Sequence, residues 1–483
     1  MSPKKNYEQE IVIQTDRRRA TIKFIKIISD LWYDETVELV LFRNQLIDRN
    51  VSEILSLLEY ARAFVEKPIS IFDALDIAKA ITKLDLPPSK IDIGKLAYEC
   101  ILEKSTCHNK LDFVKNKLSD AKNYNSNTPK DIVLYGFGRI GRLLARELAS
   151  KMGKGHQMRL RAIVTRGELT PVVLEKRAAL LRNDSVHGEF LGTVITDFKN
   201  KALIINGTTV YMISANAPEA IDYTKYGIDK ALVIDNTGAY RDESGLGRHM
   251  QAKGIAKVLL TAPGKGVPNI VYGVNQFDYN PDKVSIFSAA SCTTNAITPV
   301  LSVIEDNFGI KNGHLETIHA YTNDQNLVDN MHKKYRRGRA AAINMVITET
   351  GAGKAVAKAL PKLKDKLTSS AIRVPVPNGS LAILNIHLLK KTNREALNNV
   401  MKKYALEGKL VEQIKYSLSN ELVSSDIVGS GAAPAIFDSH ATIVSDEGDD
   451  AILYVWYDNE YGYTHQVIRL ARYISKINRF IYY

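Results

Sequence analysis

The chain has 483 residues, 45% of them hydrophobic and 24% charged, which is typical of a globular protein with two or three domains. No apolar run approaches the roughly 20 residues of a membrane-spanning helix, and the first residues carry acidic side chains without an apolar segment. Because a secretory signal needs an apolar segment and an organelle transit peptide avoids acids, we expect a cytoplasmic protein with no membrane partner.

The formal net charge of +12 is unevenly distributed along the chain. Residues 1–128 contain 20 Lys/Arg and 19 Asp/Glu, so almost all of the excess lies in residues 129–483. No Lys/Arg block with interleaved aromatic residues occurs there, and the densest basic cluster is Lys333-Lys334-Tyr335-Arg336-Arg337-Gly338-Arg339. Such a balance fits anionic substrates and cofactors, and we expect no specific nucleic-acid partner.

Residues 1–128 predict an all-helical N-terminal extension. Asn50 and Glu53 form a capping pattern before an apolar helical period. Ser70 begins a second helix that ends near residues 87–88, which are both proline. A third apolar period follows, and the polar run at residues 123–129 is typical of a linker.

Three cysteines in so long a chain do not make a disulfide framework, which favours a reducing compartment. Cys100 lies on the apolar face of the third helix, where we expect it to pack in the core. Cys107 shows no partner pattern.

From Lys130 onward the pattern changes to alternating strands and helices. Residues 131–135 predict a short buried strand, a helical period follows residue 141, and another strand is predicted at residues 160–164. This context makes the intervening glycine turn a signal for dinucleotide binding. The turn consists of Gly136, Phe137, Gly138, Arg139, Ile140 and Gly141. Its first glycine permits the tight turn, its second lets the backbone approach a pyrophosphate, and its third allows close helix–strand packing, while the helix N-terminus supplies amide donors.

The end of the second strand leaves the choice of coenzyme open. The run there is Val164-Thr165-Arg166-Gly167-Glu168. Arg166 can pair with a 2′-phosphate, which favours NADP, whereas Glu168 could bind a 2′-hydroxyl, which favours NAD. Arg166 could equally be a solvated loop residue.

A candidate nucleophile occurs in Ser291-Cys292-Thr293-Thr294-Asn295, between a β-prone run and a helical period. A cysteine at such a turn lies near the positive end of the helix dipole, which favours the thiolate. His319, 27 residues downstream, is a candidate base that can complete the activation and carry protons. Taken alone, Cys292 would more often be a small core residue.

The glycine turn, the cysteine segment and the histidine segment occur in an order that resembles glyceraldehyde-3-phosphate dehydrogenase, over residues 130–483. Other segments match motifs of that family: Asn183-Asp184-Ser185-Val186-His187-Gly188, Asp235-Asn236-Thr237-Gly238, Arg336-Arg337-Gly338-Arg339, Thr350-Gly351-Ala352-Gly353-Lys354, Arg373-Val374-Pro375-Val376-Pro377 and Trp456-Tyr457-Asp458-Asn459-Glu460-Tyr461-Gly462-Tyr463. The resemblance implies a Rossmann-type NAD(P)-binding domain at residues 129–290, completed by a C-terminal helix at 461–483. It also implies a catalytic domain with a mixed or antiparallel sheet at residues 291–460.

The reaction implied by the resemblance is the reversible oxidative phosphorylation of D-glyceraldehyde 3-phosphate to 1,3-bisphosphoglycerate, a step of glycolysis and gluconeogenesis. Cys292 would attack the aldehyde as a thiolate, held in an ion pair with His319, to give a thiohemiacetal. His319 would accept the hemiacetal proton as hydride leaves for the nicotinamide, and phosphate would then displace the resulting thioester. The Cys292 amide and the His319 ring could stabilise the oxyanions. We assign no metal ligands.

Two anions must be bound, and hydroxyls, amides and arginines suit them. The resemblance assigns the substrate phosphate to Thr322, Asp324 and Arg373, with the carboxylate of Asp324 orienting Arg373. It assigns the incoming phosphate to Ser291, Thr293, Thr350 and Gly351, although any of these hydroxyls could equally cap a helix.

Further coenzyme contacts and the assembly also follow from the resemblance. Thr237 and Gly238 would lie beside the coenzyme, Asn459 would bond the nicotinamide carboxamide, and Tyr463 would lie near that ring. Residues 335–339 match a loop that reaches the cofactor of a neighbouring subunit, which implies a homotetramer. Residues 1–128 are absent from the common family pattern, and could pack on the core, extend an interface or bind another protein.

Two alternatives differ in the use of the site. Erythrose-4-phosphate dehydrogenase has a similar site but releases its acyl group to water, and the retained Thr293, Thr350 and Gly351 argue against it. A non-catalytic regulator or scaffold on the same fold predicts a damaged site, and the retained Cys292 and His319 argue against that.

Overall fold

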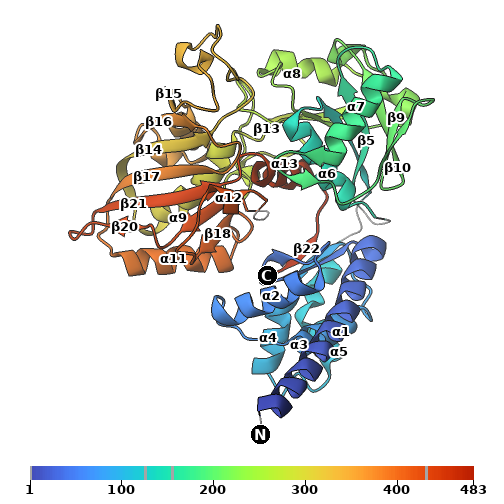
Figure 1. The fold of residues 1–483 in the computed structure, drawn as a ribbon, viewed down its shortest axis with the longest axis vertical. Helices are drawn as coiled ribbons and strands as arrows, with labels where there is room; N and C mark the ends of the chain where they lie inside the picture. The colour runs from blue at the N-terminus through green and yellow to red at the C-terminus, as the bar shows by residue number, and fades with distance from the viewer. Residues whose placement is uncertain (1–2, 125–127, 154–156, 430–432) are drawn as a thin grey trace. The chain divides into compact units, whose positions relative to one another are not determined.

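The computed structural model describes residues 3–124, 128–153, 157–429 and 433–483 (Figure 1). The chain forms two compact units. The first comprises Met1–Pro129, Met152–Gln157 and Ile477–Tyr483, and the second comprises Lys130–Lys151 and Met158–Lys476. The expected linker at residues 123–129 includes residues 125–127, which lie outside the described residues. None of the described helices is long and apolar enough to cross a membrane.

The first unit combines helices with a small sheet. Its helices are α1 (Pro3–Glu35), α2 (Val51–Ala63), α3 (Ile71–Ile81), α4 (Ile93–Leu102) and α5 (Lys110–Lys117), with a 3-10 helix at Ser119–Asn123. The predicted caps are confirmed, because the Asn50 and Ser70 side chains accept hydrogen bonds from the third residues of α2 and α3. The sheet was not expected; it consists of β1 (Val37–Leu41), β2 (Asn44–Gln45), β3 (Ser89–Asp92) and β22 (Phe480–Tyr482), in the order β2-β1-β3-β22.

Strand β22 brings the C-terminal residues into this first unit, where the red end of the ribbon lies among blue elements (Figure 1). It pairs in parallel with β3, with Phe480 opposite Ser89. Arg479 forms an ion pair of 2.6 Å with the buried Glu38. The prediction of a terminal helix over residues 461–483 is therefore wrong beyond Ile474, where α13 (Tyr461–Ile474) ends.

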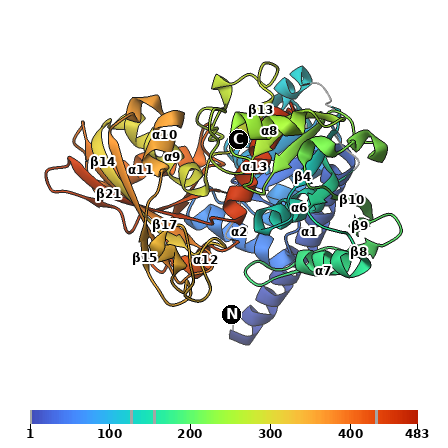
Figure 2. The same cartoon turned by 90° about the horizontal axis from the view of Figure 1, so that it is seen from above.

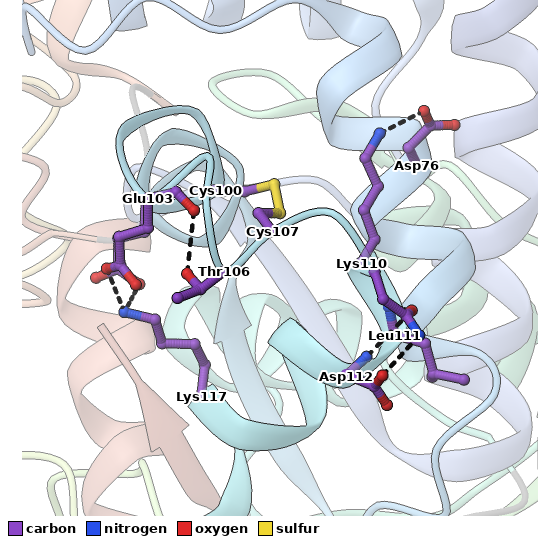
Figure 3. Close-up of a disulfide and its surroundings, with 11 residues drawn as sticks. Asp76, Cys100, Glu103, Thr106, Cys107, Lys110, Leu111, Asp112 and Lys117 are labelled. Carbon is purple, nitrogen blue, oxygen red and sulfur yellow. Dashed lines mark hydrogen bonds and ion pairs between the residues drawn. A yellow bond between two sulfur atoms is a disulfide. The ribbon is translucent and has the colours of Figure 1, made fainter.

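The expectation for two of the cysteines is also wrong. Cys100 in α4 and Cys107 beyond its end form a disulfide across a short turn (Figure 3). Within that turn the Glu103 carbonyl accepts hydrogen bonds from the amide of Cys107 and from the hydroxyl of Thr106. The number of cysteines therefore gives no support for a reducing compartment. Cys292 is the free cysteine among the described residues.

The second unit begins with an eight-stranded sheet. Its strands are β4 (Lys130–Tyr135), β5 (Met158–Thr165), β8 (Val194–Asp197), β9 (Ala202–Ile205), β10 (Thr208–Ser214), β11 (Ala231–Asp235), β12 (Ile255–Leu260) and β13 (Ile286–Ser288). The order is β13-β12-β11-β4-β5-β10-β9-β8; the strands from β13 to β10 pair in parallel, and β9 is antiparallel to both β10 and β8. The associated helices are α6 (Arg139–Ser150), α7 (Pro171–Arg182) and α8 (Glu243–Met250), with a small hairpin of β6 (Asn183–Asp184) and β7 (Gly188–Glu189). This is the Rossmann-type arrangement expected from the sequence.

The rest of the second unit is built on a mixed sheet in the order β15-β16-β14-β17-β21-β19-β18, with β20 (Ile443–Val444) pairing with β21. Its strands are β14 (Ile310–Ala320), β15 (Val346–Thr348), β16 (Leu367–Val374), β17 (Ser380–Leu388), β18 (Ile414–Ser417), β19 (Ala435–Asp438) and β21 (Asp450–Tyr457). Helices α9 (Cys292–Asn307), α10 (Ala352–Ala359) and α11 (Arg394–Leu406) cover one face (Figures 1 and 2). The short α12 (Ser424–Ile427) packs against β17 and β21. A catalytic domain with a mixed sheet was expected.

Candidate active site

Cys292 is the first residue of α9, and the short turn of residues 289–291 separates it from β13. Its predecessor Ser291 caps the helix, because the Ser291 hydroxyl accepts a hydrogen bond of 3.1 Å from the Thr294 amide. The thiol therefore lies where unpaired amides of the first helical turn give a positive potential.

The turn before Cys292 is held in an unfavourable backbone conformation. Ala290 has φ of 54°, in the left-handed region that costs energy for a residue with a Cβ. The Tyr463 hydroxyl donates to the Ala290 carbonyl at 2.9 Å, and the Asn295 amide donates to the Ala289 carbonyl at 2.7 Å. These buried bonds fix the direction in which the chain enters α9.

His319, near the end of β14, faces Cys292 with its Nε2 3.6 Å from the cysteine Sγ. Its Nδ1 lies 2.7 Å from the Ala320 carbonyl. A carbonyl can only accept a hydrogen bond, so this shorter contact favours a proton on Nδ1, whereas the Arg373 guanidinium 3.1 Å away could donate to Nδ1 only without that proton. Nε2 is then the atom with a free lone pair, and it points at the thiol as a general base requires.

The surroundings favour a neutral pair in the ligand-free site. Burial, followed by the nearby charge of Arg373, lowers the pKa of His319 to about 3. Burial raises the pKa of the Cys292 thiol, against an opposing effect of Arg373 and of hydrogen bonds in the first helical turn. Both pKa shifts oppose the expected ion pair between thiolate and imidazolium, which stays a prediction. From the neutral pair, the thiol proton would move to Nε2 as sulfur attacks.

Arg373 joins this pair to a second group of polar side chains. Its Nη1 lies 3.1 Å from His319 Nδ1 and donates to the Thr322 hydroxyl at 3.0 Å. The Thr322 hydroxyl in turn donates to Asp324. The direct cationic partner of Asp324 is Arg337 rather than Arg373. Asp324 is linked to Arg373 through the Thr322 hydroxyl, and its expected role in orienting Arg373 stays a prediction.

Two residues of this site were missed as site residues by the sequence analysis. Arg337 also donates to the Thr348 hydroxyl at 3.1 Å, and in the sequence it was only one member of a basic cluster. Tyr457 is buried, with its hydroxyl 3.0 Å from the Thr293 hydroxyl and 2.7 Å from the Thr317 hydroxyl. Both positions stand in segments that resemble family motifs, but their roles depend on partners that are 11 to 164 residues away in sequence.

The four residues expected to bind the incoming phosphate have different surroundings. The Thr293 hydroxyl is engaged with Tyr457 inside the protein, and the Ser291 hydroxyl caps α9. Thr350 accepts from the Ala352 amide at 3.2 Å at the start of α10, which packs against α9. Gly351 is exposed at the same helix N-terminus, with no atom near its α-carbon on the side where a Cβ would point.

The glycine turn between β4 and α6 has the geometry that a bound pyrophosphate requires. A Cβ on Gly136, which has φ of 107°, would lie 2.8 Å from Asn236 Oδ1, and a Cβ on Gly141 would lie 2.5 Å from the Gly136 carbonyl oxygen. Gly138 precedes α6 and has no atom within 4 Å of its Cβ position. The turn therefore combines tight packing at Gly136 and Gly141 with an open approach at Gly138.

The side chains of the other residues of the turn contact other parts of the protein. The Arg139 guanidinium bonds Glu460 at 2.6 Å and Asp184 at 3.1 Å. Phe137 is buried and Ile140 is half-buried. The side chains of these three residues therefore contact the protein, and only the backbone of the turn is left for a role in coenzyme binding.

The remaining coenzyme candidates lie at the ends of strands in the same sheet and after β21. Arg166 and Glu168 are exposed just beyond β5. Thr237 follows β11, with its amide 2.9 Å from an Asp235 carboxylate oxygen, and Gly238 adopts φ of 67°. Asn459 is buried directly after β21. Tyr463 is buried in α13, bonded to the turn before Cys292.

Comparison with known families matches both parts of the second unit. Residues 130–243 match the glyceraldehyde 3-phosphate dehydrogenase NAD binding domain, and residues 291–459 match the C-terminal domain of the same enzyme family.

Individual relatives agree with this assignment. The glyceraldehyde-3-phosphate dehydrogenase-like protein of Pseudomonas aeruginosa is 48% identical over 461 residues, covering 94% of this chain and 98% of that protein. Glyceraldehyde-3-phosphate dehydrogenase 2 of Trichormus variabilis and the enzyme of Priestia megaterium are each 40% identical, over 71% of this chain and 98% of their own lengths. The Pseudomonas alignment is long enough to include most of the N-terminal extension, whereas the other two are not.

Proposed function

Because this chain belongs to the glyceraldehyde-3-phosphate dehydrogenase family, we propose that it catalyses the reversible oxidation and phosphorylation of D-glyceraldehyde 3-phosphate to 1,3-bisphosphoglycerate. The observation that carries the proposal is the contact of 3.6 Å between the Cys292 thiol and the unprotonated Nε2 of His319, beside the Arg373 guanidinium. A thiol, a base and a half-buried cation provide a nucleophile, a proton acceptor and an anion anchor within one site.

In the forward direction, His319 Nε2 takes the thiol proton as Cys292 Sγ attacks the aldehyde carbon, and it then returns this proton to the former carbonyl oxygen, which gives a thiohemiacetal. The Cys292 amide, at the start of α9, stabilises the developing oxyanion. Hydride then leaves the same carbon as His319 accepts the hydroxyl proton. A bound nicotinamide coenzyme supplies the hydride acceptor. The resulting thioester is attacked by inorganic phosphate, which releases the acyl phosphate and leaves the cysteine sulfur to regain a proton.

The two phosphate groups are assigned to different parts of the site. Arg373 and Thr322 bind the substrate phosphate, with Asp324 acting through Thr322. Arg337, held by Asp324, lies close enough to add a second cation. Thr350, Gly351 and the helix N-terminus at Ser291 and Thr293 bind the incoming phosphate through hydroxyl and amide groups, with the Thr293 contribution limited to its backbone because of Tyr457.

The coenzyme is NAD or NADP, held by the turn from Gly136 to Gly141, by Thr237 and Gly238, and by Asn459 and Tyr463. Arg166 is the specificity candidate, because it is exposed at the end of β5 where a 2′-phosphate would lie. Kinetics with NAD and NADP should favour NADP, and Arg166→Asp should shift the ratio of kcat/KM toward NAD. An unchanged ratio would remove Arg166 from the coenzyme site.

The decisive experiment is turnover with and without inorganic phosphate. The proposed reaction requires phosphate or arsenate, and oxidation of glyceraldehyde 3-phosphate should stop at one acyl group per Cys292 without it. Equal turnover in both conditions would instead favour the erythrose-4-phosphate type of reaction, in which water releases the acyl group. Absence of turnover with either aldehyde, in a protein that still binds coenzyme, would favour a regulator or scaffold.

The assembly and the location belong to the same proposal. We infer a cytoplasmic protein that forms a homotetramer. Residues 335–339 would extend toward a neighbouring subunit, because Tyr335 is 95% exposed, whereas Arg337 contacts residues of its own site. Measurement of the mass in solution tests this, and a monomer of full activity would exclude the subunit contact.

A further inference from the structure

Ser380 is a buried residue at the start of β17. Its hydroxyl lies between β14, the strand that carries His319, and Asn459, the residue proposed to bind the nicotinamide. The hydroxyl accepts a hydrogen bond of 3.1 Å from the amide of Ala320, the neighbour of His319. It also lies 2.8 Å from Oδ1 of Asn459. All three residues are buried, so these bonds are protected from competing water.

The direction of these two bonds determines the orientation of the Asn459 amide. A backbone N–H can only donate, so the Ser380 oxygen must accept from Ala320, and in the structure the single Ser380 proton is directed at Asn459. The atom of Asn459 that receives this proton must be its carbonyl oxygen. The amide is therefore fixed with Oδ1 toward Ser380 and Nδ2 on the opposite side.

The outward Nδ2 of Asn459 has no hydrogen-bond acceptor in the described parts of the chain. It is also not among the fully buried polar atoms that lack a partner. It is thus a donor held ready for a ligand atom. If the amide turned by half a rotation, the same position would present a carbonyl oxygen, which cannot donate to the oxygen of a carboxamide.

We propose that Ser380 is a positioning residue for the coenzyme, which fixes the Asn459 amide so that Nδ2 donates to the nicotinamide carboxamide oxygen. This inference rests on the proposed role of Asn459. Ser380 of β17 would thus set the orientation of the nicotinamide. Because the same hydroxyl accepts a hydrogen bond from the backbone next to His319, one residue would position both the hydride acceptor and the base.

The test compares two probes that differ only in the nicotinamide. Dissociation constants are measured by calorimetry for the full-length protein with the preferred coenzyme and with the corresponding ADP-ribose, which lacks the nicotinamide ring. In Ser380→Ala, the coenzyme should bind about 5- to 20-fold more weakly, the effect of one lost hydrogen bond and a misoriented donor. ADP-ribose should bind within about twofold of the unchanged protein.

Two further variants make the result specific. Ser302→Ala removes another buried serine hydroxyl, which bonds the Pro299 carbonyl within α9, and should leave both constants unchanged. The double variant Ser380→Ala with Asn459→Ala should bind coenzyme no more weakly than Asn459→Ala alone. Should Ser380→Ala fail to fold, Ser380→Cys keeps the volume with a weaker donor and allows the same comparison.

Equal weakening of coenzyme and ADP-ribose would mean general damage and would overturn the proposal, as would unchanged binding of both or additive losses in the double variant. None of these measurements depends on turnover. A protein that shows the predicted binding pattern but does not oxidise glyceraldehyde 3-phosphate would therefore refute the proposed function and leave the role of Ser380 intact.

Discussion

Arg373 touches both the reacting pair and the proposed phosphate anchor, so its substitution separates two roles of a single side chain. Arg373→Gln should lower kcat/KM for glyceraldehyde 3-phosphate by about 100-fold or more, because charge-assisted hydrogen bonds to a phosphate are lost. Unphosphorylated glyceraldehyde, which cannot use that anchor, should lose less than about tenfold.

Arg394 provides the matched control, because its guanidinium donates to the carbonyls of Ser439 and His440 away from the site. Arg394→Gln should leave both rates within about twofold. Equal losses for both aldehydes in Arg373→Gln would show that Arg373 acts on Cys292 and His319 rather than on the phosphate.

Asp184 gives a stability prediction with a defined dependence on pH. Burial alone would raise the pKa of this carboxyl, but hydrogen bonds from the Val186 and His187 amides and the nearby Arg139 outweigh it and hold the pKa below its ordinary value. The carboxylate therefore stabilises the folded state fully above the unfolded pKa of about 4, and this contribution is lost as pH falls below that value.

Asp184→Asn should accordingly reduce the free energy of unfolding by about 1–3 kcal/mol at pH 7, and the difference should shrink below pH 4. Urea unfolding at pH 7, 5 and 3.5 measures it. A difference of the same size at every pH would mean that shape and neutral hydrogen bonds account for the effect.

How far single residues could be predicted from the sequence depends on how local their signal is. Cys292, His319 and the three glycines stand in contiguous motifs, and the structure brings the first two together. Arg337 also stands in a quoted motif, but its contacts within this site were not predicted, because Asp324 and Thr348 reach it through the fold. The protonation state of the pair was also beyond the sequence, since it depends on burial and on the distance to Arg373.

At the scale of elements, the same contrast holds in the first unit. Helices α2 and α3 were predicted because Asn50 with Glu53 forms a capping pattern, and Ser70 stands at the start of a helical stretch. The sheet was not predicted, because β1 has five residues buried throughout and shows no alternation. Strand β22 has three residues, and its partner β3 lies almost the whole chain away.

The disulfide between Cys100 and Cys107 leads to a prediction for this unit. Closing the short turn after α4 should stabilise it by about 2–3 kcal/mol through restriction of the unfolded chain. Reduction with dithiothreitol should therefore lower the temperature at which the first unit unfolds, as followed by circular dichroism.

A variant with Cys100→Ser and Cys107→Ser should already unfold at the lower temperature and should not respond to the reductant. Denatured but unreduced protein should react as a single thiol, Cys292. Reaction of all three cysteines, or an equal response of the variant to the reductant, would exclude the stabilising bridge.

At the scale of the whole molecule, the first unit depends on both ends of the described chain. Removal of residues 477–483 takes away β22 and the ion pair between Arg479 and Glu38. The first unit should then unfold at a lower temperature and become sensitive to limited proteolysis. Coenzyme binding by the second unit should be unchanged, because those residues are not part of it.

Arg479→Gln, which breaks the ion pair but keeps the strand, should give a smaller effect. An unchanged resistance of the first unit to protease in the truncated protein would mean that β22 is dispensable. A deletion of the N-terminal extension should therefore remove residues 477–483 as well as residues 1–128. Removing residues 1–128 alone would leave residues 477–483 without the sheet that they join.

The pairing of β22 with β3 also constrains the order of events on the ribosome. Phe480 is made 391 residues after its partner Ser89, and at 5–20 residues per second this separation is about 20–80 seconds of synthesis. The unit that is translated first thus exposes the edge of β3 until almost the whole described chain has emerged. During that interval the edge is a surface for incorrect strand pairing or for a chaperone, and the second unit has the opportunity to fold before the first is complete.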